Sequence, residues 1–322
     1  MNQELLKLGT RASRLALWQA HSVQKQLVER GHQVTIVPIS TTGDQVQNRY
    51  LHEIGGKGLF VKEIEQALED KTIDLAVHSL KDLPAEIDSR FDLSAYLPRE
   101  HPHDVLIMQS KQFQTINLDL IFSQLNGAKI GTSSLRRQSF LKHLNPSIET
   151  HPLRGNVDTR LEKLANSSLL DGVVLAYAGL HRLNLNLSDF SVFALNPETF
   201  IPCAGQGIIC VQTLVQSFAS SVVEKLNDPS AALAARTERR ILKLLGADCK
   251  LPFGCYAKVE NKMVTSIDCI VLNLKGKICH VRLDGLNLTQ PDPEVEKRLI
   301  EKMIANNLNK ILTDLNLAHV KC

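Results

Sequence analysis

Arginine and hydroxyl side chains gather in short polar segments, each of which follows an apolar run. These segments hold Arg11 and Ser13, then Thr132, Ser133, Ser134, Arg136 and Arg137, then Arg154, Gly155 and Arg160. The fork of an arginine binds a carboxylate through two parallel hydrogen bonds. A single arginine at a helix end is equally well explained as a solvated charge. Five arginines at equivalent places therefore favour a site for a ligand with several carboxylates.

One carboxylate lies among these cations. Asp82 follows Lys81 directly, in a polar segment after another apolar run. In a basic cleft, such a carboxylate can stabilise a transient cation or move a proton. Capping of a helix ahead of Leu83 and Pro84 explains Asp82 equally well, and the spacing does not separate the two interpretations.

Seven cysteines are present, an odd count without a C-x-x-C pair. This pattern predicts neither a metal site nor a disulfide framework, and the reduced thiols of a cytoplasmic protein are expected. Cys249 lies beside Lys250 in a loop with Gly and Pro, so its thiolate is favoured. It ranks only slightly ahead of Cys203, which lies in a similar loop.

The charge balance and the apolar stretches exclude two classes of partner. The 322 residues include 37 Lys and Arg against 34 Asp and Glu, and the net charge of +3 is too small for a general nucleic-acid binder. The longest apolar stretches fall far short of the roughly 20 residues of a membrane-spanning helix, and the first residues do not resemble a signal peptide. We therefore expect a cytoplasmic protein with no nucleic-acid or membrane partner.

Two blocks of alternating strands and helices must position the polar segments. The predicted strands are 5–8, 34–39, 74–80, 128–131, 148–153 and 172–177. The predicted helices are 14–30 with Ser13 as its cap, 60–68, 134–144, and one that Asn156 caps. This order is typical of doubly wound α/β domains, in which ligands bind at the carboxyl ends of strands. The polar segments fall at those ends.

The last third has a different pattern and predicts a small α+β domain from about residue 228. A helix over 231–245 precedes the loop that holds Cys249. Two-residue alternation over 263–272 and 277–283 predicts a β-hairpin. A long amphipathic helix is expected over 294–315.

Taken together, eight motifs resemble the hydroxymethylbilane synthases, a family also called porphobilinogen deaminases. They are GTRASRLALWQA (9–20), GGKGLFVKEIE (55–65), AVHSLKDLP (76–84), IGTSSLRRQ (130–138), LRGNVDTRLEKL (153–164), LAYAGLHRL (175–183), PCAGQG (202–207) and the loop around Cys249. They follow the family order over about residues 5–256. Cys203, Asp158, Asp248 and Cys255 stand where the family usually has other residues, and none of these departures removes a charged ligand.

The resemblance implies three domains. The first two resemble type II periplasmic binding proteins, with the active cleft between them, and the third carries the cofactor. The implied boundaries are 1–104 with 205–227 for the first domain, 105–204 for the second and 228–322 for the third. We also expect a monomer.

The same resemblance implies a deaminating transferase of heme biosynthesis. Members of the family carry a dipyrromethane cofactor on a cysteine by a thioether, and the motif match makes this Cys249. They condense four porphobilinogen molecules head to tail on this primer. Ammonia is released, and water then frees the linear tetrapyrrole hydroxymethylbilane.

Residue roles carry over from the matched motifs. Asp82 corresponds to the catalytic carboxylate, which assists ammonia loss and stabilises the cationic methylene-pyrrole intermediate. The five arginines match those that hold the acetate and propionate groups of cofactor and substrate. Supporting ligands are Ser13, Lys81, Thr132, Ser133, Ser134 and Gly155, and the substrate-binding set adds Gln19, Phe60, Arg182 and Gln206.

Two other interpretations stay open at this stage. A bilobed binding protein for a small carboxylate-bearing ligand needs the cations of the cleft but neither Asp82 nor Cys249. A phosphoribosyltransferase of similar architecture needs a phosphate-binding loop and carboxylates that hold a metal. The arginine-rich segments favour carboxylates over phosphate as the ligand.

Overall fold

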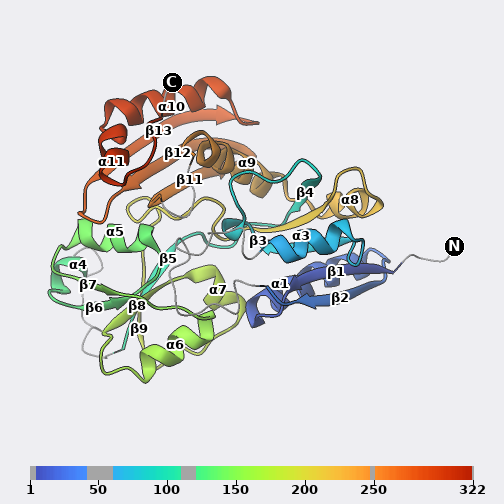
Figure 1. Cartoon of the computed structure of the whole chain (residues 1–322), viewed down its shortest axis with the longest axis horizontal. Helices are drawn as coiled ribbons and strands as arrows, with labels where there is room; N and C mark the ends of the chain where they lie inside the picture. The colour runs from blue at the N-terminus through green and yellow to red at the C-terminus, as the bar shows by residue number, and fades with distance from the viewer. Residues whose placement is uncertain (1–4, 42–60, 110–120, 247–250, 321–322) are drawn as a thin grey trace.

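The computed structural model describes residues 5–41, 61–109, 121–246 and 251–320. Within these ranges the strands form two five-stranded sheets and one three-stranded sheet. Figure 1 shows the three-stranded sheet and its helices above the second sheet, with the first sheet to one side. The predicted fold class, two α/β units followed by a small α+β unit, is confirmed.

The first sheet is mixed and has the order β2-β1-β3-β10-β4. Its parallel strands are β1 (Leu6–Arg11), β2 (Val34–Ile39) and β3 (Leu75–Ser79), and β10 (Ile209–Leu214) runs antiparallel between β3 and β4 (Phe91–Tyr96). Two helices, α1 (Arg14–Glu29) and α3 (Lys62–Glu69), cover opposite faces, because their apolar stripes pack on alternate residues of β3. The short α8 (Phe218–Val223) and the turn η6 (Glu224–Leu226) pack on the same side as α1.

The second sheet repeats this plan with the order β7-β6-β8-β5-β9. Its strands are β5 (Asp104–Met108), β6 (Lys129–Gly131), β7 (Glu149–His151), β8 (Gly172–Ala176) and β9 (Ser191–Ala194). Its helices are α4 (Ile121–Gln124), α5 (Leu135–Leu144), α6 (Val157–Ala165) and α7 (Tyr177–Arg182). Since β4 precedes this sheet and β10 follows it, the chain crosses between the two sheets twice.

The three-stranded sheet is antiparallel, with β12 (Met263–Leu272) between β11 (Phe253–Glu260) and β13 (Ile278–Leu288). Three helices accompany it, α9 (Pro229–Leu244), α10 (Pro293–Ala305) and α11 (Leu308–Asp314). The first half of α9 packs its alanines against the first sheet, whereas Ile241 and Leu242 join the core of the third. One helix therefore belongs to two cores.

Several predicted elements need correction. The single helix expected over 294–315 is wrong, because Asn307 has a left-handed backbone (φ 65°) that separates α10 from α11. The strand predicted over 148–153 contains only β7. Asn156 precedes α6 as predicted, but its side chain makes no capping hydrogen bond. The domain boundaries stay predictions.

Candidate functional site

The carboxyl ends of strands from both larger sheets surround one cavity of about 640 Å³. Helices α1, α5 and α6 begin at its wall, where their N-cap positions Ser13, Ser134 and Asn156 lie. The Ser13 hydroxyl accepts from the Ala16 amide at 3.3 Å and that of Ser134 from the Arg137 amide at 3.4 Å. Three helix N-termini thus face one space, an arrangement that favours anions.

Most of the predicted site residues line this cavity. They are Arg11, Ser13, Gln19, Lys81, Asp82, Ser133, Ser134, Arg136, Arg137, Arg154, Gly155, Arg160, Arg182 and Gln206. Thr132 does not line it, because this buried side chain accepts a hydrogen bond from the Ser134 amide at 3.3 Å. Phe60 and Cys249 lie outside the described residues. Leu251, two positions after Cys249, is part of the cavity wall.

Two of the lining arginines have no carboxylate partner among the residues that the structure describes. Arg160 donates from Nε to the Gly155 carbonyl at 2.8 Å, and Arg182 donates from Nη2 to the Gly207 carbonyl at 2.7 Å. Within the described ranges no carboxylate oxygen lies within ion-pair distance of either guanidinium. Burial lowers the pKa of each to about 10. A buried cation without a counter-ion points to an anionic ligand.

Arg136 and Arg137 are held differently, by the buried carboxylate of Asp104. The Nη2 atoms of the two arginines lie 2.6 and 2.8 Å from its two oxygens. Burial alone would raise the pKa of Asp104, but the two guanidiniums hold it well below its usual range. The two arginines are therefore fixed in orientation, and together with Asp104 they carry one net positive charge.

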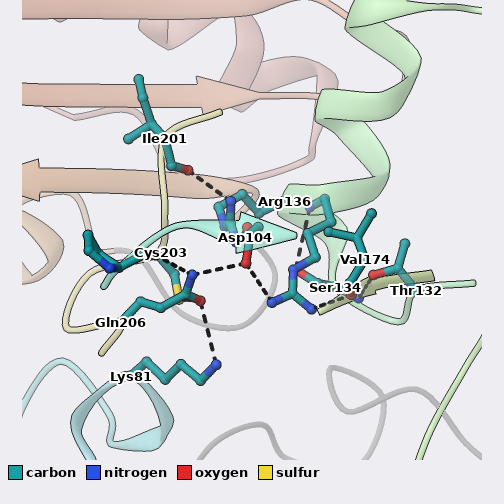
Figure 2. A network of polar contacts seen from close by, with 11 residues as sticks. Lys81, Asp104, Thr132, Ser134, Arg136, Val174, Ile201, Cys203 and Gln206 are labelled. Atoms are coloured by element: carbon teal, nitrogen blue, oxygen red, sulfur yellow. Dashed lines mark hydrogen bonds and ion pairs between the residues drawn. The ribbon is translucent and has the colours of Figure 1, made fainter. Parts of the chain in front are cut away.

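A polar chain connects this group to Lys81. Figure 2 shows Lys81 pointing toward Gln206, and Gln206 toward Asp104. Gln206 donates from Nε2 to Asp104 Oδ1 at 2.9 Å, and its Oε1 lies 3.5 Å from Lys81 Nζ. Cys203 Sγ lies 3.4 Å from the same Oε1. Burial lowers the pKa of Lys81, against the opposing effects of Cys203 and Asp82.

Asp82 ends the 3₁₀ turn η3 (Leu80–Asp82) that follows β3, and it lines the cavity. It does not cap a helix, so the alternative interpretation from the sequence is wrong. Among the residues that the structure describes, Asp82 has no hydrogen-bond or ion-pair partner. Its charge nevertheless acts on Lys81 and Arg160. Asp82 and Asp158 are thus the two carboxylates among the described lining residues, whose other charged side chains are cationic.

Sequence reasoning missed Asp104. The only signal available is an acidic residue that opens the apolar run Val105–Met108, where a buried carboxylate requires a cationic partner. The sequence does not identify that partner, because Arg136 and Arg137 lie more than thirty residues away.

Two family models match this chain. The model described as "Porphobilinogen deaminase, dipyromethane cofactor binding domain" matches residues 6–219, and "Porphobilinogen deaminase, C-terminal domain" matches residues 232–305. The chain belongs to the porphobilinogen deaminase family. The enzyme activity predicted from the motifs, porphobilinogen deamination in tetrapyrrole biosynthesis with a domain that binds dipyrromethane, is thereby confirmed.

The sequences of two porphobilinogen deaminases are similar to this chain over most of its length. The porphobilinogen deaminase of Syntrophotalea carbinolica is 38% identical over 326 residues, which cover 98% of each chain. That of Albidiferax ferrireducens is 42% identical over 282 residues, 86% of this chain and 85% of the relative. Among solved structures, the methionine-binding protein MetQ is 10% identical, with a TM-score of 0.42 over 73% of this chain and 91% of its own.

The described residues include neither a membrane-spanning helix nor a metal-binding cluster. No helix among them is long and apolar enough to cross a membrane. No cluster of three or more His, Cys, Asp or Glu side chains among them is arranged to hold a metal ion.

Proposed function

We propose that this porphobilinogen deaminase condenses four porphobilinogen molecules head to tail on a dipyrromethane primer bound to Cys249 through a thioether. Each addition releases ammonia, and water then frees hydroxymethylbilane. The observation that carries this proposal is a cavity in which Arg160 and Arg182 lack carboxylate partners and Asp82 lacks any partner in the described part of the chain. These groups match a substrate with acidic side arms and a reacting centre that becomes positive.

The residues present fit a dipyrromethane. Each of its two rings carries two carboxylates, so the group brings four negative charges. Among the described lining residues there are seven Lys or Arg side chains and two carboxylates, Asp82 and Asp158. We expect Arg11, Arg154 and Arg160 to bind the ring carboxylates, with Ser13 and Ser134 as hydroxyl donors. When bound, the dipyrromethane supplies the nucleophilic pyrrole carbon to which the first substrate is joined.

Chain connectivity supports Cys249 as the attachment point. Leu251 and Phe253 line the cavity from the start of β11, and Leu242 lines it from the end of α9. Two residues of extended chain span at most about 7 Å. Cys249 precedes Leu251 by only two positions, which supports it as the attachment point.

Asp82 is the residue that we expect to orient the reacting pyrrole and to stabilise its positive charge. A carboxylate that accepts hydrogen bonds from pyrrole N–H groups orients the ring and stabilises positive charge as the aminomethyl group loses ammonia. The nearby cations hold the acidic arms of the substrate, so binding and charge stabilisation fall on different residues.

We also propose, from the sequence, that the enzyme is a cytoplasmic monomer.

Intact-mass measurement tests this proposal. We expect the purified protein to exceed its chain mass by two pyrrole units, and Cys249→Ser to lose the excess because an alcohol does not form the thioether. Cys203→Ser is the matched control, since Cys203 lines the cavity and should not be needed for attachment. A wild-type chain without added mass, or a Cys249→Ser variant that keeps it, would contradict the attachment. A bare chain that binds porphobilinogen without consuming it would instead favour a binding protein.

A further inference from the structure

One face of α1, which covers the first sheet, contacts helices of the second sheet. Arg14, Leu15 and Trp18 share this face, because residues three and four positions apart are neighbours on a helix. Arg14 Nη1 lies 3.9 Å from Asp158 Oδ2 of α6. Leu15 Cδ2 lies 3.5 Å from the point that a Cβ atom of residue 179 would occupy, so it packs directly on Gly179 of α7. The first turns of α1 therefore lie against the second sheet's helices, and α1 lies next to α7 (Figure 1).

Trp18 of this face contacts Arg182, one of the two cavity arginines without a carboxylate partner in the described part of the chain. The Cζ atom of Arg182 lies over the indole ring, 5.8 Å from its centroid. Arg182 is 9% exposed, whereas Trp18 is 40% exposed. Arg182 lines the large cavity and Trp18 does not, so the indole contacts the guanidinium from behind the cavity wall.

Two contacts hold the Arg182 guanidinium, and both come from outside the second sheet. Arg182 belongs to α7, whereas Trp18 belongs to α1. Gly207, whose carbonyl accepts from Arg182 Nη2 at 2.7 Å, lies on the second crossing between the larger sheets. The orientation of this guanidinium therefore depends on how the two larger sheets stand relative to each other.

An aromatic ring can hold a cation without neutralising it. The face of an indole attracts a guanidinium but carries no net charge. A guanidinium beside a ring face also keeps N–H donors for a carboxylate, which it binds in its own plane. Burial lowers the pKa of Arg182 to about 10, so the group is still charged near pH 7. In contrast, Arg136 is held by the carboxylate of Asp104, which offsets part of its charge.

We propose that Trp18 is a positioning residue, whose ring holds the Arg182 guanidinium in the orientation in which it binds a carboxylate arm of porphobilinogen. This inference rests on the proposed function. Trp18 touches neither the substrate nor the reacting atoms, so its effect passes through Arg182. Such a contact strengthens binding of the substrate and of the transition state equally, and it therefore acts on KM and not on kcat.

Steady-state kinetics of Trp18 variants test this role. Trp18→Leu removes the aromatic face, and we expect KM for porphobilinogen to rise about two- to fivefold, the usual strength of an exposed cation–π contact, with kcat nearly unchanged. Trp18→Phe keeps a ring and should give a KM between those of the wild type and Trp18→Leu. Val28→Ala is the matched control, because Val28 is exposed at the other end of α1 and should leave KM unchanged. A Trp18→Leu variant with the KM of the wild type would contradict the proposal.

A double-mutant cycle shows whether Trp18 acts through Arg182. Arg182→Gln should itself raise KM, and the addition of Trp18→Leu should then raise it no further. The same fold increase from Trp18→Leu in both backgrounds would mean that Trp18 acts independently of Arg182, which would overturn the proposal.

Tryptophan fluorescence provides a measurement that needs no turnover and no Trp18 variant. Trp18 is the only tryptophan of the chain, so its emission reports the surroundings of this one ring. We expect Arg182→Gln, which removes the cation beside the ring, to change the emission spectrum, and Val28→Ala to leave it unchanged. An Arg182→Gln spectrum identical to that of the wild type would show that the ring does not hold the guanidinium. Product formation by the wild type tests the proposed function separately.

Discussion

At the level of single residues, the large cavity contains two kinds of arginine. Arg136 and Arg137 are bound to Asp104, whereas Arg160 and Arg182 donate to backbone carbonyls and have no carboxylate partner in the described part of the chain. The charges of Arg136 and Arg137 are partly neutralised by Asp104, whereas no described carboxylate neutralises the charges of Arg160 and Arg182. We therefore expect a ligand carboxylate to gain more from Arg160 and Arg182 than from Arg136 and Arg137.

Asp82→Asn separates the charge of this side chain from its shape. The amide has nearly the same size but no negative charge, so we expect the rate of porphobilinogen consumption to fall about 10²- to 10⁴-fold. Attachment of the cofactor should survive, and intact mass measures this on the same sample. Turnover within a few fold of the wild type would remove the proposed role of Asp82.

The site was predictable from sequence to the extent that it follows strand ends. Arg11, Asp82 and Arg154 each follow an apolar run, and α/β geometry brings such positions together. The pairing of Arg136 and Arg137 with Asp104 was not predictable, because it depends on long-range packing of β5 against β8.

At the level of elements, the end of the chain shows how one residue divides a helix. Asn306 and Asn307 both have low helix propensity, and the Asn306 side chain donates to the His280 carbonyl of β13 at 2.8 Å. Asn307 then takes the left-handed backbone and starts α11 in a new direction. The apolar positions keep helical spacing across this break, which is why the sequence predicted one helix.

Two substitutions at position 307 test this explanation. Glycine adopts the left-handed backbone without strain, whereas alanine pays about 1 kcal/mol for it. We therefore expect Asn307→Ala to lower the melting temperature and Asn307→Gly to leave it close to that of the wild type. Equal melting temperatures for the two variants would show that the backbone conformation of Asn307 is not what divides the helix.

The strand predictions were correct where an apolar run is flanked by turn residues, and they were wrong or missing elsewhere. The limits of β2 and β12 agree with the sequence pattern. In contrast, β4, β5, β9, β10 and β11 were not predicted, because short apolar runs without regular alternation do not distinguish strand from buried loop. Four of these five strands pair antiparallel to a neighbour within the two larger sheets, which a simple β-α-β pattern does not anticipate.

At the level of the whole molecule, the carboxylate of Glu238 accepts hydrogen bonds from three separate parts of the chain. Glu238 of α9 is fully buried and accepts from Arg99, from the Gly205 amide and from the Ala257 amide. Arg99 and Gly205 lie on the two crossings between the larger sheets, and Ala257 lies in β11. The shape of the cavity between the sheets therefore depends on a residue outside both of them.

Glu238→Gln removes the charge at this junction. It leaves Arg99 largely buried without a counter-ion, so we expect the free energy of unfolding to fall by about 3 kcal/mol. Chemical denaturation measures the change. Lys243→Gln is the control on the same helix, because its ion pair with Glu86 is exposed and should contribute little. A Glu238→Gln variant as stable as this control would show that the junction does not need the charge.

The place of β10 also affects how the enzyme can be made on the ribosome. Because β10 lies between β3 and β4, the first sheet stays incomplete until residue 214 has been synthesised, roughly two-thirds of the way along the chain. During that interval β3 has an open edge and β4 lacks its neighbour, and such edges readily pair with other chains. The second sheet comes from one continuous stretch, Asp104–Ala194, so it can close first. The first sheet, most of whose strands are synthesised first, is thus completed only after the second sheet has been synthesised.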